Sequence, residues 1–159
     1  MPHDLYERDI LEWSEHQADL LSHLARHEKY GAIDWMNVIE EIASVGRAQL
    51  NDVRGLLRQA MHYIVRIHLD WNDAMRPDWE LELGCSLDDA ADQITPSMRV
   101  RIDLDAMWGR VRSQSCRHHP DDPRCHALPD RCPWTLDALL ANDRDKLFAT
   151  LAGWPLEPL

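Results

Sequence analysis

Cysteine and histidine side chains gather in one segment of this 159-residue chain, residues 113–133. The segment holds three of the four cysteines and three of the nine histidines, namely Cys116, His118, His119, Cys125, His126 and Cys132. Thiolate and imidazole groups are zinc ligands, and Cys116, His118, Cys125 and His126 are the candidate set that would hold such a loop together. However, the spacing lacks a Cys-x2-Cys pair, and the adjacent His118 and His119 cannot easily bind the same ion. The pattern therefore favours a polar loop with free thiols, and a zinc site is the alternative.

A glutamate and a histidine form the second candidate set for chemistry. Glu41 lies beside the apolar stripe through Val38 and Val45, and a half-buried carboxylate can act as a general acid or base. His68 falls near the centre of another apolar stripe, and its partner across the core could be Glu41. An ion pair of the glutamate with an arginine such as Arg47, and a neutral structural histidine, are the simpler interpretations. A Glu–His acid–base pair is kept as the alternative.

The elements that position these residues are predicted to be helices, because apolar residues recur at three- and four-residue spacing. We expect helices over residues 5–27, 34–46, 47–71, 77–94 and 97–112, followed by two short C-terminal helices. Asp34 is an expected N-cap, and Gly46 is an expected bend. Thr135 and either Asn142 or Asp143 are the expected caps of the last two helices. The sequence thus predicts an all-α, single-domain helical bundle over residues 1–159, with a long Pro-rich loop at 113–133.

Composition narrows the classes of partner. The net charge is -11, which argues against binding to nucleic acid or to an anionic membrane surface. No apolar run approaches the roughly 20 residues that span a bilayer, and no secretory signal is visible at the start. Free cysteines then fit a reducing cytoplasm. We therefore expect a cytoplasmic protein whose partner is another protein.

Five short blocks, in order, resemble the bacterial family called domain of unknown function 29. They are LYERD at 5–9, DWMNVIEEIASVGR at 34–47, PDW at 77–79, TPSMR at 95–99 and CPWTLDALL at 132–140. The resemblance covers nearly the whole chain and implies an all-helical bacterial domain, but it implies no activity. The Cys/His-rich loop departs from the family's pattern.

No phosphate-binding glycine loop, nucleophile elbow or dinucleotide fingerprint is present in the sequence. The leading hypothesis is therefore a protein-interaction or regulatory module without catalysis and without a cofactor. The alternative is a hydrolase-type enzyme that uses a metal or the Glu41–His68 pair. The sequence does not indicate an oligomeric state.

Overall fold

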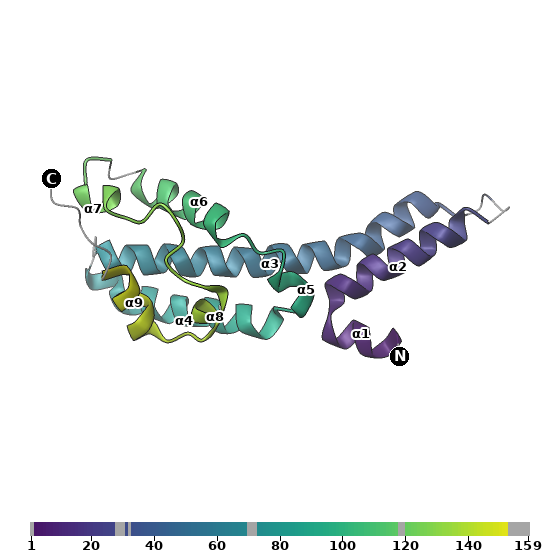
Figure 1. Cartoon of the computed structure of the whole chain (residues 1–159), viewed down its shortest axis with the longest axis horizontal. Helices are drawn as coiled ribbons and strands as arrows, with labels where there is room; N and C mark the ends of the chain where they lie inside the picture. The colour runs from purple at the N-terminus through teal and green to yellow at the C-terminus, as the bar shows by residue number, and fades with distance from the viewer. Residues whose placement is uncertain (1, 28–30, 32, 70–72, 118–119, 153–159) are drawn as a thin grey trace. The chain divides into compact units, whose positions relative to one another are not determined.

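The computed structural model describes residues 2–27, 31, 33–69, 73–117 and 120–152, and every regular element in these ranges is helical (Figure 1). The elements are α1 Pro2–Arg8, α2 Ile10–Ala25, α3 Trp35–Leu69, the 3-10 turn η1 Asp73–Met75, α4 Arg76–Gln93, α5 Pro96–Arg99, α6 Leu104–Cys116, α7 Pro123–His126, α8 Leu136–Leu140 and α9 Arg144–Ala152. The all-α prediction is confirmed. Residue contacts gather into two units, Met1–Val53 with Gln93–Ile102, and Arg54–Asp92 with Asp103–Leu159.

In the first unit, the helix expected over 5–27 is broken at Asp9, so that prediction is wrong at this position. Asp9 is only 3% exposed and accepts hydrogen bonds from Glu12 N (3.1 Å), Thr95 Oγ1 (2.9 Å) and Ser97 N (2.7 Å) and Oγ (2.6 Å). Burial by itself would raise the pKa of Asp9, but these hydrogen bonds outweigh it and lower the pKa below its usual value. The break exists because Asp9 caps α2 and binds the start of α5 at once.

Gly46 does not interrupt its helix, because α3 continues from Trp35 to Leu69. Gly46 is buried, and a Cβ atom there would lie 2.6 Å from Leu11 Cα and against the hydroxyl of Ser14. Glycine therefore permits a close approach of α2 and α3. The expected cap is confirmed, since Asp34 accepts a hydrogen bond from Asn37 N at 3.3 Å.

The helix expected over 97–112 is split into α5 and α6. Asp103 begins α6 by accepting a hydrogen bond from Ala106 N at 2.9 Å. Val100, in the intervening segment, is 84% exposed. The three- and four-residue spacing of apolar residues did not reveal this break. Asp103 and the apolar residues on either side of it fit one continuous helix equally well.

The core of the second unit is built on the C-terminal half of α3. Its fully buried side chains include Leu57, Met61, Ile64, Leu69, Leu83, Leu87, Trp108, Leu139 and Leu147. Two tryptophans fasten irregular segments to this core: Trp108 Nε1 donates to Pro129 O at 2.7 Å, and Trp134 Nε1 donates to Leu147 O at 3.0 Å. Their rings meet edge to face at 5.4 Å. These contacts hold the segment after α6 in place.

The C-terminal caps were predicted correctly. Thr135 accepts a hydrogen bond from Ala138 N at 3.2 Å, and Asp143 accepts one from Lys146 N at 3.2 Å. Gly84 does not interrupt α4, which continues to Gln93. The guanidinium of Arg144 occupies the space that a Cβ atom at this position would need.

Candidate functional site

The segment 113–133 is less irregular than predicted, since α6 continues to Cys116 and residues Pro123–His126 form α7. The end of α6 is fastened to α3 by His62, a residue that the sequence did not single out. His62 Nε2 lies 3.1 Å from Gln114 Oε1, and Nδ1 lies 2.9 Å from Ser115 Oγ. The amide oxygen can only accept, so Nε2 donates and Nδ1 accepts from the hydroxyl. Burial lowers the pKa of His62, which favours this neutral ring.

The short helix α7 is placed by its own cap and by one arginine. Asp122 accepts a hydrogen bond from Arg124 N at 2.9 Å, and Arg124 Nη1 donates to Leu69 O at the end of α3. Cys125 follows directly and is 6% exposed. The position of this cysteine is therefore set by the polar contacts of the residue before it.

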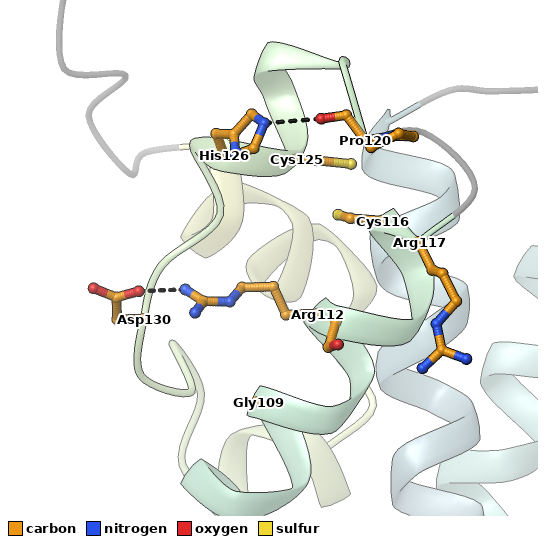
Figure 2. A pocket seen from close by; sticks show the side chains of 9 residues that line it. Gly109, Arg112, Cys116, Arg117, Pro120, Cys125, His126 and Asp130 are labelled. Carbon is orange, nitrogen blue, oxygen red and sulfur yellow. Dashed lines mark hydrogen bonds and ion pairs between the residues drawn. The ribbon is translucent and has the colours of Figure 1, made fainter.

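Between α6 and α7 lies a cavity of about 480 Å³, which Figure 2 shows from close by. It is lined by Gly109, Arg112, Ser113, Cys116, Arg117, Pro120, Cys125, His126 and Asp130. The side chains of Cys116 and Cys125 point toward one another. Arg112 turns away toward Asp130, with which it forms an ion pair. The cavity thus combines two neighbouring thiols with cationic side chains.

The thiols of Cys116 and Cys132 are protonated at neutral pH. Burial raises the pKa of Cys116 to about 12, and the neighbouring Cys125 adds to the increase. Cys132 lies apart from this pair, where its thiol donates to Trp134 O at 3.4 Å. Burial raises the pKa of Cys132 to about 11. Neither group is a ready nucleophile, because the thiolate is the reactive form.

The expected zinc ligands are brought together only in part. Cys116 and Cys125 are neighbours, but His126 Nε2 lies 3.0 Å from Pro120 O, so its ring is engaged with the backbone. His118 lies outside the described residues. Among the residues that the structure describes, no three side chains of His, Cys, Asp or Glu are grouped to hold a metal ion. The zinc site stays a prediction.

The expected half-burial of Glu41 is not found, because its side chain is exposed. The contact of α3 with α2 is made on the side of Gly46, and Glu41 lies on another side of the helix. The ion pair with Arg47 is formed by Glu40 instead. Glu41 and His68 belong to different units, and the Glu41–His68 pair stays a prediction.

His68 is half-buried and lines a smaller cavity of about 210 Å³, together with Arg124, Leu128 and Leu151. Burial lowers the pKa of His68, and the charge of Arg124 lowers it further. The ring is therefore neutral at pH 7, in line with the structural role that the sequence favoured.

A second surface appears on α2 that the sequence pattern had assigned to the core. Leu11, Ser14 and Ala18 form the buried side of α2. Leu20 and Leu24 stand on another side and are 50% and 51% exposed. Trp13 lies seven residues before Leu20. The rings of Trp13 and of Tyr6 in α1 pack edge to face, with their centroids 4.8 Å apart. We call Trp13, Leu20 and Leu24 the outer stripe of α2.

None of the helices in the described part of the chain is long and apolar enough to cross a membrane.

Comparison with known proteins adds the family and one structural relative. The search of curated proteins found no match. The fold is similar to the 1.45 Å crystal structure of an alpha-helical protein of unknown function from Rhodospirillum rubrum. The TM-score is 0.75 at 28% sequence identity, over 96% of this chain and 98% of that chain. The family model "Domain of unknown function DUF29" matches residues 5–144. Because that match spans most of the chain, the protein belongs to the DUF29 family.

Proposed function

We propose that this protein is a non-catalytic interaction module whose outer stripe of α2 binds an amphipathic, basic helix of a partner protein. The observation that carries the proposal is the pair of half-exposed leucines, Leu20 and Leu24, one turn apart on α2. A single exposed leucine needs no explanation, but apolar residues repeated along one side of a helix are the usual contact surface for another helix.

Helix geometry supports a distinct binding side. Trp13, Leu20 and Leu24 are spaced by seven and four residues, which places them on one side of α2. The buried residues Leu11 and Ala18 occupy a different side, which packs toward α3 through the close contact at Gly46. A helix with one buried side normally presents polar residues on its other sides. The outer stripe is apolar instead of polar. Contact with a partner helix would remove its apolar side chains from water.

Charge supports a basic partner. Residues 1–53 contain eleven acidic residues and only four lysines and arginines. Glu12 and Asp19 are exposed on α2, and Glu41 is exposed on α3. A partner helix with lysine or arginine beside its apolar residues would face these carboxylates, which favours it over an acidic helix of the same pattern.

The same observations support the hydrolase-type alternative less well. Glu41 is exposed, so its carboxylate lacks the burial that tunes a general base. The thiol of Cys116 is held in the protonated form, because burial raises its pKa. We also propose a cytoplasmic location for the module, because all four cysteines are free thiols and a reducing compartment preserves them.

The direct test uses a synthetic peptide probe, an amphipathic helix with leucines on one side and lysines on the other. Binding to the full chain is measured by fluorescence anisotropy. The matched control is the same peptide with glutamates in place of the lysines. We expect the lysine peptide to bind and the glutamate peptide to bind at least about tenfold more weakly, or roughly 1.4 kcal/mol.

Two variants of the protein make the test specific to α2. The double variant Leu20→Glu/Leu24→Glu should weaken binding of the lysine peptide about tenfold or more. Leu81→Glu is the matched control, because Leu81 is also an exposed leucine in a helix, α4. Circular dichroism checks that both variants fold. Equal weakening by both variants, or equal binding of both peptides, would contradict the proposal.

A cellular test asks what the native partner is. Tagged wild type, the double variant and Leu81→Glu are expressed in the source cell, and the captured proteins are quantified by mass spectrometry. A partner with a basic amphipathic segment, lost only in the double variant, would support the proposal. A second copy of this chain as the only captured species, with a dimer in sedimentation that the double variant abolishes, would replace it with self-association.

A further inference from the structure

We propose that Cys116 and Cys125 form a reversible thiol–disulfide site that reacts with an anionic low-molecular-weight disulfide, of the class of oxidised glutathione. The site lies in the second unit and is independent of the outer stripe of α2. A covalent bond here would tie the last residue of α6 to the four-residue helix α7.

The pairing of the thiols carries the proposal. Cys116 and Cys125 come from different helices, nine positions apart, and their side chains point toward one another across the cavity (Figure 2). The influence of Cys125 on the pKa of Cys116 agrees with this arrangement. The other two cysteines are arranged differently, because Cys85 is exposed on α4 and Cys132 donates to Trp134 O. Cys116 and Cys125 are therefore the two cysteines that the fold sets facing each other.

Exposure assigns different roles to the two cysteines. Cys116 is half-buried and lines the cavity of about 480 Å³, so a small disulfide can reach it. Cys125 is 6% exposed, so its sulfur meets Cys116 more readily than it meets a reagent from solvent. Cys116 is therefore the attacking residue, and Cys125 is the resolving residue.

The charges of the cavity select the reagent. Arg112 and Arg117 both line it. Arg112 is paired with Asp130, whereas the guanidinium of Arg117 is directed away from the two thiols and forms no ion pair or hydrogen bond with the residues that the structure describes (Figure 2). Oxidised glutathione carries carboxylates at its ends, which an arginine can bind through two parallel hydrogen bonds. Arg117 is therefore the residue that would favour an anionic disulfide over a cationic or neutral one.

The reaction balances without any further reagent. The Cys116 thiolate attacks one sulfur of the small disulfide, which forms a mixed disulfide and releases one thiolate. The Cys125 thiolate then attacks the Cys116 sulfur, which forms the Cys116–Cys125 bond and releases a second thiolate. The two protons lost by the protein thiols end on the two released small thiols. The protein is oxidised by two electrons, and the small disulfide is reduced by two.

The reaction is slow at neutral pH and accelerates with pH. Burial raises the pKa of Cys116 to about 12, so the thiolate fraction rises about tenfold for each pH unit below that value. The rate of oxidation should therefore rise about tenfold per pH unit between roughly pH 7 and 9. A pair with this behaviour stays reduced unless the concentration of the oxidant is high or the exposure is long.

The test uses the full chain in a Cys85→Ser background, because exposed Cys85 would form adducts of its own. The reduced protein is incubated with oxidised glutathione and a chelator, and free thiols and adducts are followed by alkylation and intact mass spectrometry. We expect two of the three remaining thiols to be lost with no retained glutathione. Peptide mapping should then identify a bond between Cys116 and Cys125.

Single substitutions separate the two roles. Cys125→Ser should retain one glutathione on Cys116, because the resolving thiol is missing. Cys116→Ser should react at least about tenfold more slowly, because buried Cys125 is left alone. Circular dichroism confirms that both variants fold. Equal reactivity of the two variants, or a bond that involves Cys132, would overturn the assignment, as would full retention of the thiols at pH 9.

The selectivity for an anionic reagent has its own control. Arg117→Ala should slow the reaction with oxidised glutathione several-fold and leave the reaction with neutral hydroxyethyl disulfide unchanged. If the substitution slows both reagents equally, Arg117 does not select the reagent.

Discussion

The two halves of α3 have similar apolar patterns and different surroundings. Residues 35–53 belong to the first unit, where Met36 is 82% exposed and Val38 and Val45 are also exposed. Residues 54–69 belong to the second unit, where nearly every apolar side chain of the helix is fully buried. One continuous helix therefore supplies a closed core in one unit and an open apolar surface in the other.

The difference lies in what holds each unit together. The first unit relies on small and polar groups, namely Gly46, which lets two helices approach closely, and Asp9, which gathers four hydrogen bonds. The second unit relies on large buried side chains such as Trp108 and Trp134. Apolar area removed from water stabilises in proportion to its extent, so the second unit gains most from burial. The first unit keeps apolar side chains available for a partner.

The comparison is tested most strongly by Trp108→Ala. Trp108 is fully buried, and its loss removes a large ring and its hydrogen bond to Pro129. We expect the free energy of unfolding to fall by about 3–5 kcal/mol, measured by urea denaturation. Leu20→Ala is the contrasting variant and should change it by less than about 0.5 kcal/mol, because Leu20 is exposed. Similar losses in the two variants would remove the distinction between the units.

Asp9→Ala tests the polar centre of the first unit. It leaves four donors without their acceptor, and we expect a loss of about 2–3 kcal/mol at pH 7. The folded-state pKa of Asp9 is lowered, so its contribution is fully present above the unfolded-state pKa of about 3.9. That contribution is lost as the pH falls through the lower folded-state pKa.

The pH dependence separates the charge of Asp9 from its shape. Urea denaturation of wild type and Asp9→Asn is compared at pH 7 and near pH 3. The gap in the free energy of unfolding should shrink at the lower pH, because wild-type Asp9 then begins to gain a proton. A gap that is constant with pH would show that the carboxylate charge does not matter.

Gly46→Ala tests the close contact of α2 and α3. The added methyl group would meet the backbone of Leu11, which cannot move aside easily, so we expect a loss of about 1–3 kcal/mol. Gly55→Ala is the matched control on the same helix, because nothing lies within 4 Å of its would-be Cβ atom. It should stabilise the protein by about 0.5–1 kcal/mol. Two gains of equal size would show that Gly46 is an ordinary helix residue.

The smallest effect is expected at the ion pair of Arg47 with Glu40. Both side chains are largely exposed, so Arg47→Ala should change the free energy of unfolding by about 0.5 kcal/mol or less. Thermal unfolding at low and high salt measures it. A loss above about 1.5 kcal/mol would show that this part of the family's Glu-Glu…Gly-Arg block stabilises the fold directly.

Local signals predicted much of the fold. The caps Asp34, Thr135 and Asp143 were identified from residue type and position, and each accepts the hydrogen bond that defines a cap. The break at Asp9 was missed because three of its four hydrogen bonds come from residues 86 to 88 positions away. The blocks LYERD and TPSMR were recognised separately, and the structure joins them through Asp9 and Ser97. The prediction of a single domain over residues 1–159 stays a prediction.

The candidate site was predictable in composition but not in arrangement. The sequence marked residues 113–133 as rich in cysteine and histidine, and two of the expected ligands, Cys116 and Cys125, are neighbours. His126 is engaged with a backbone carbonyl instead. No local signal pointed to His62, because its partners lie on α6, more than fifty positions later.

The sequence by itself determined that the chain is helical, where most of its helices are capped, and which family it belongs to. These properties depend on residues close together in the chain and on recognisable blocks of residues. Only the tertiary structure decided which side of each helix is buried, because a period of three to four residues is the same for a core side and an exposed one. It also decided that Gly46 lies in close contact with α2, and that two cysteines nine positions apart face each other. Those outcomes depend on which helices pack together, and long-range contacts determine that packing.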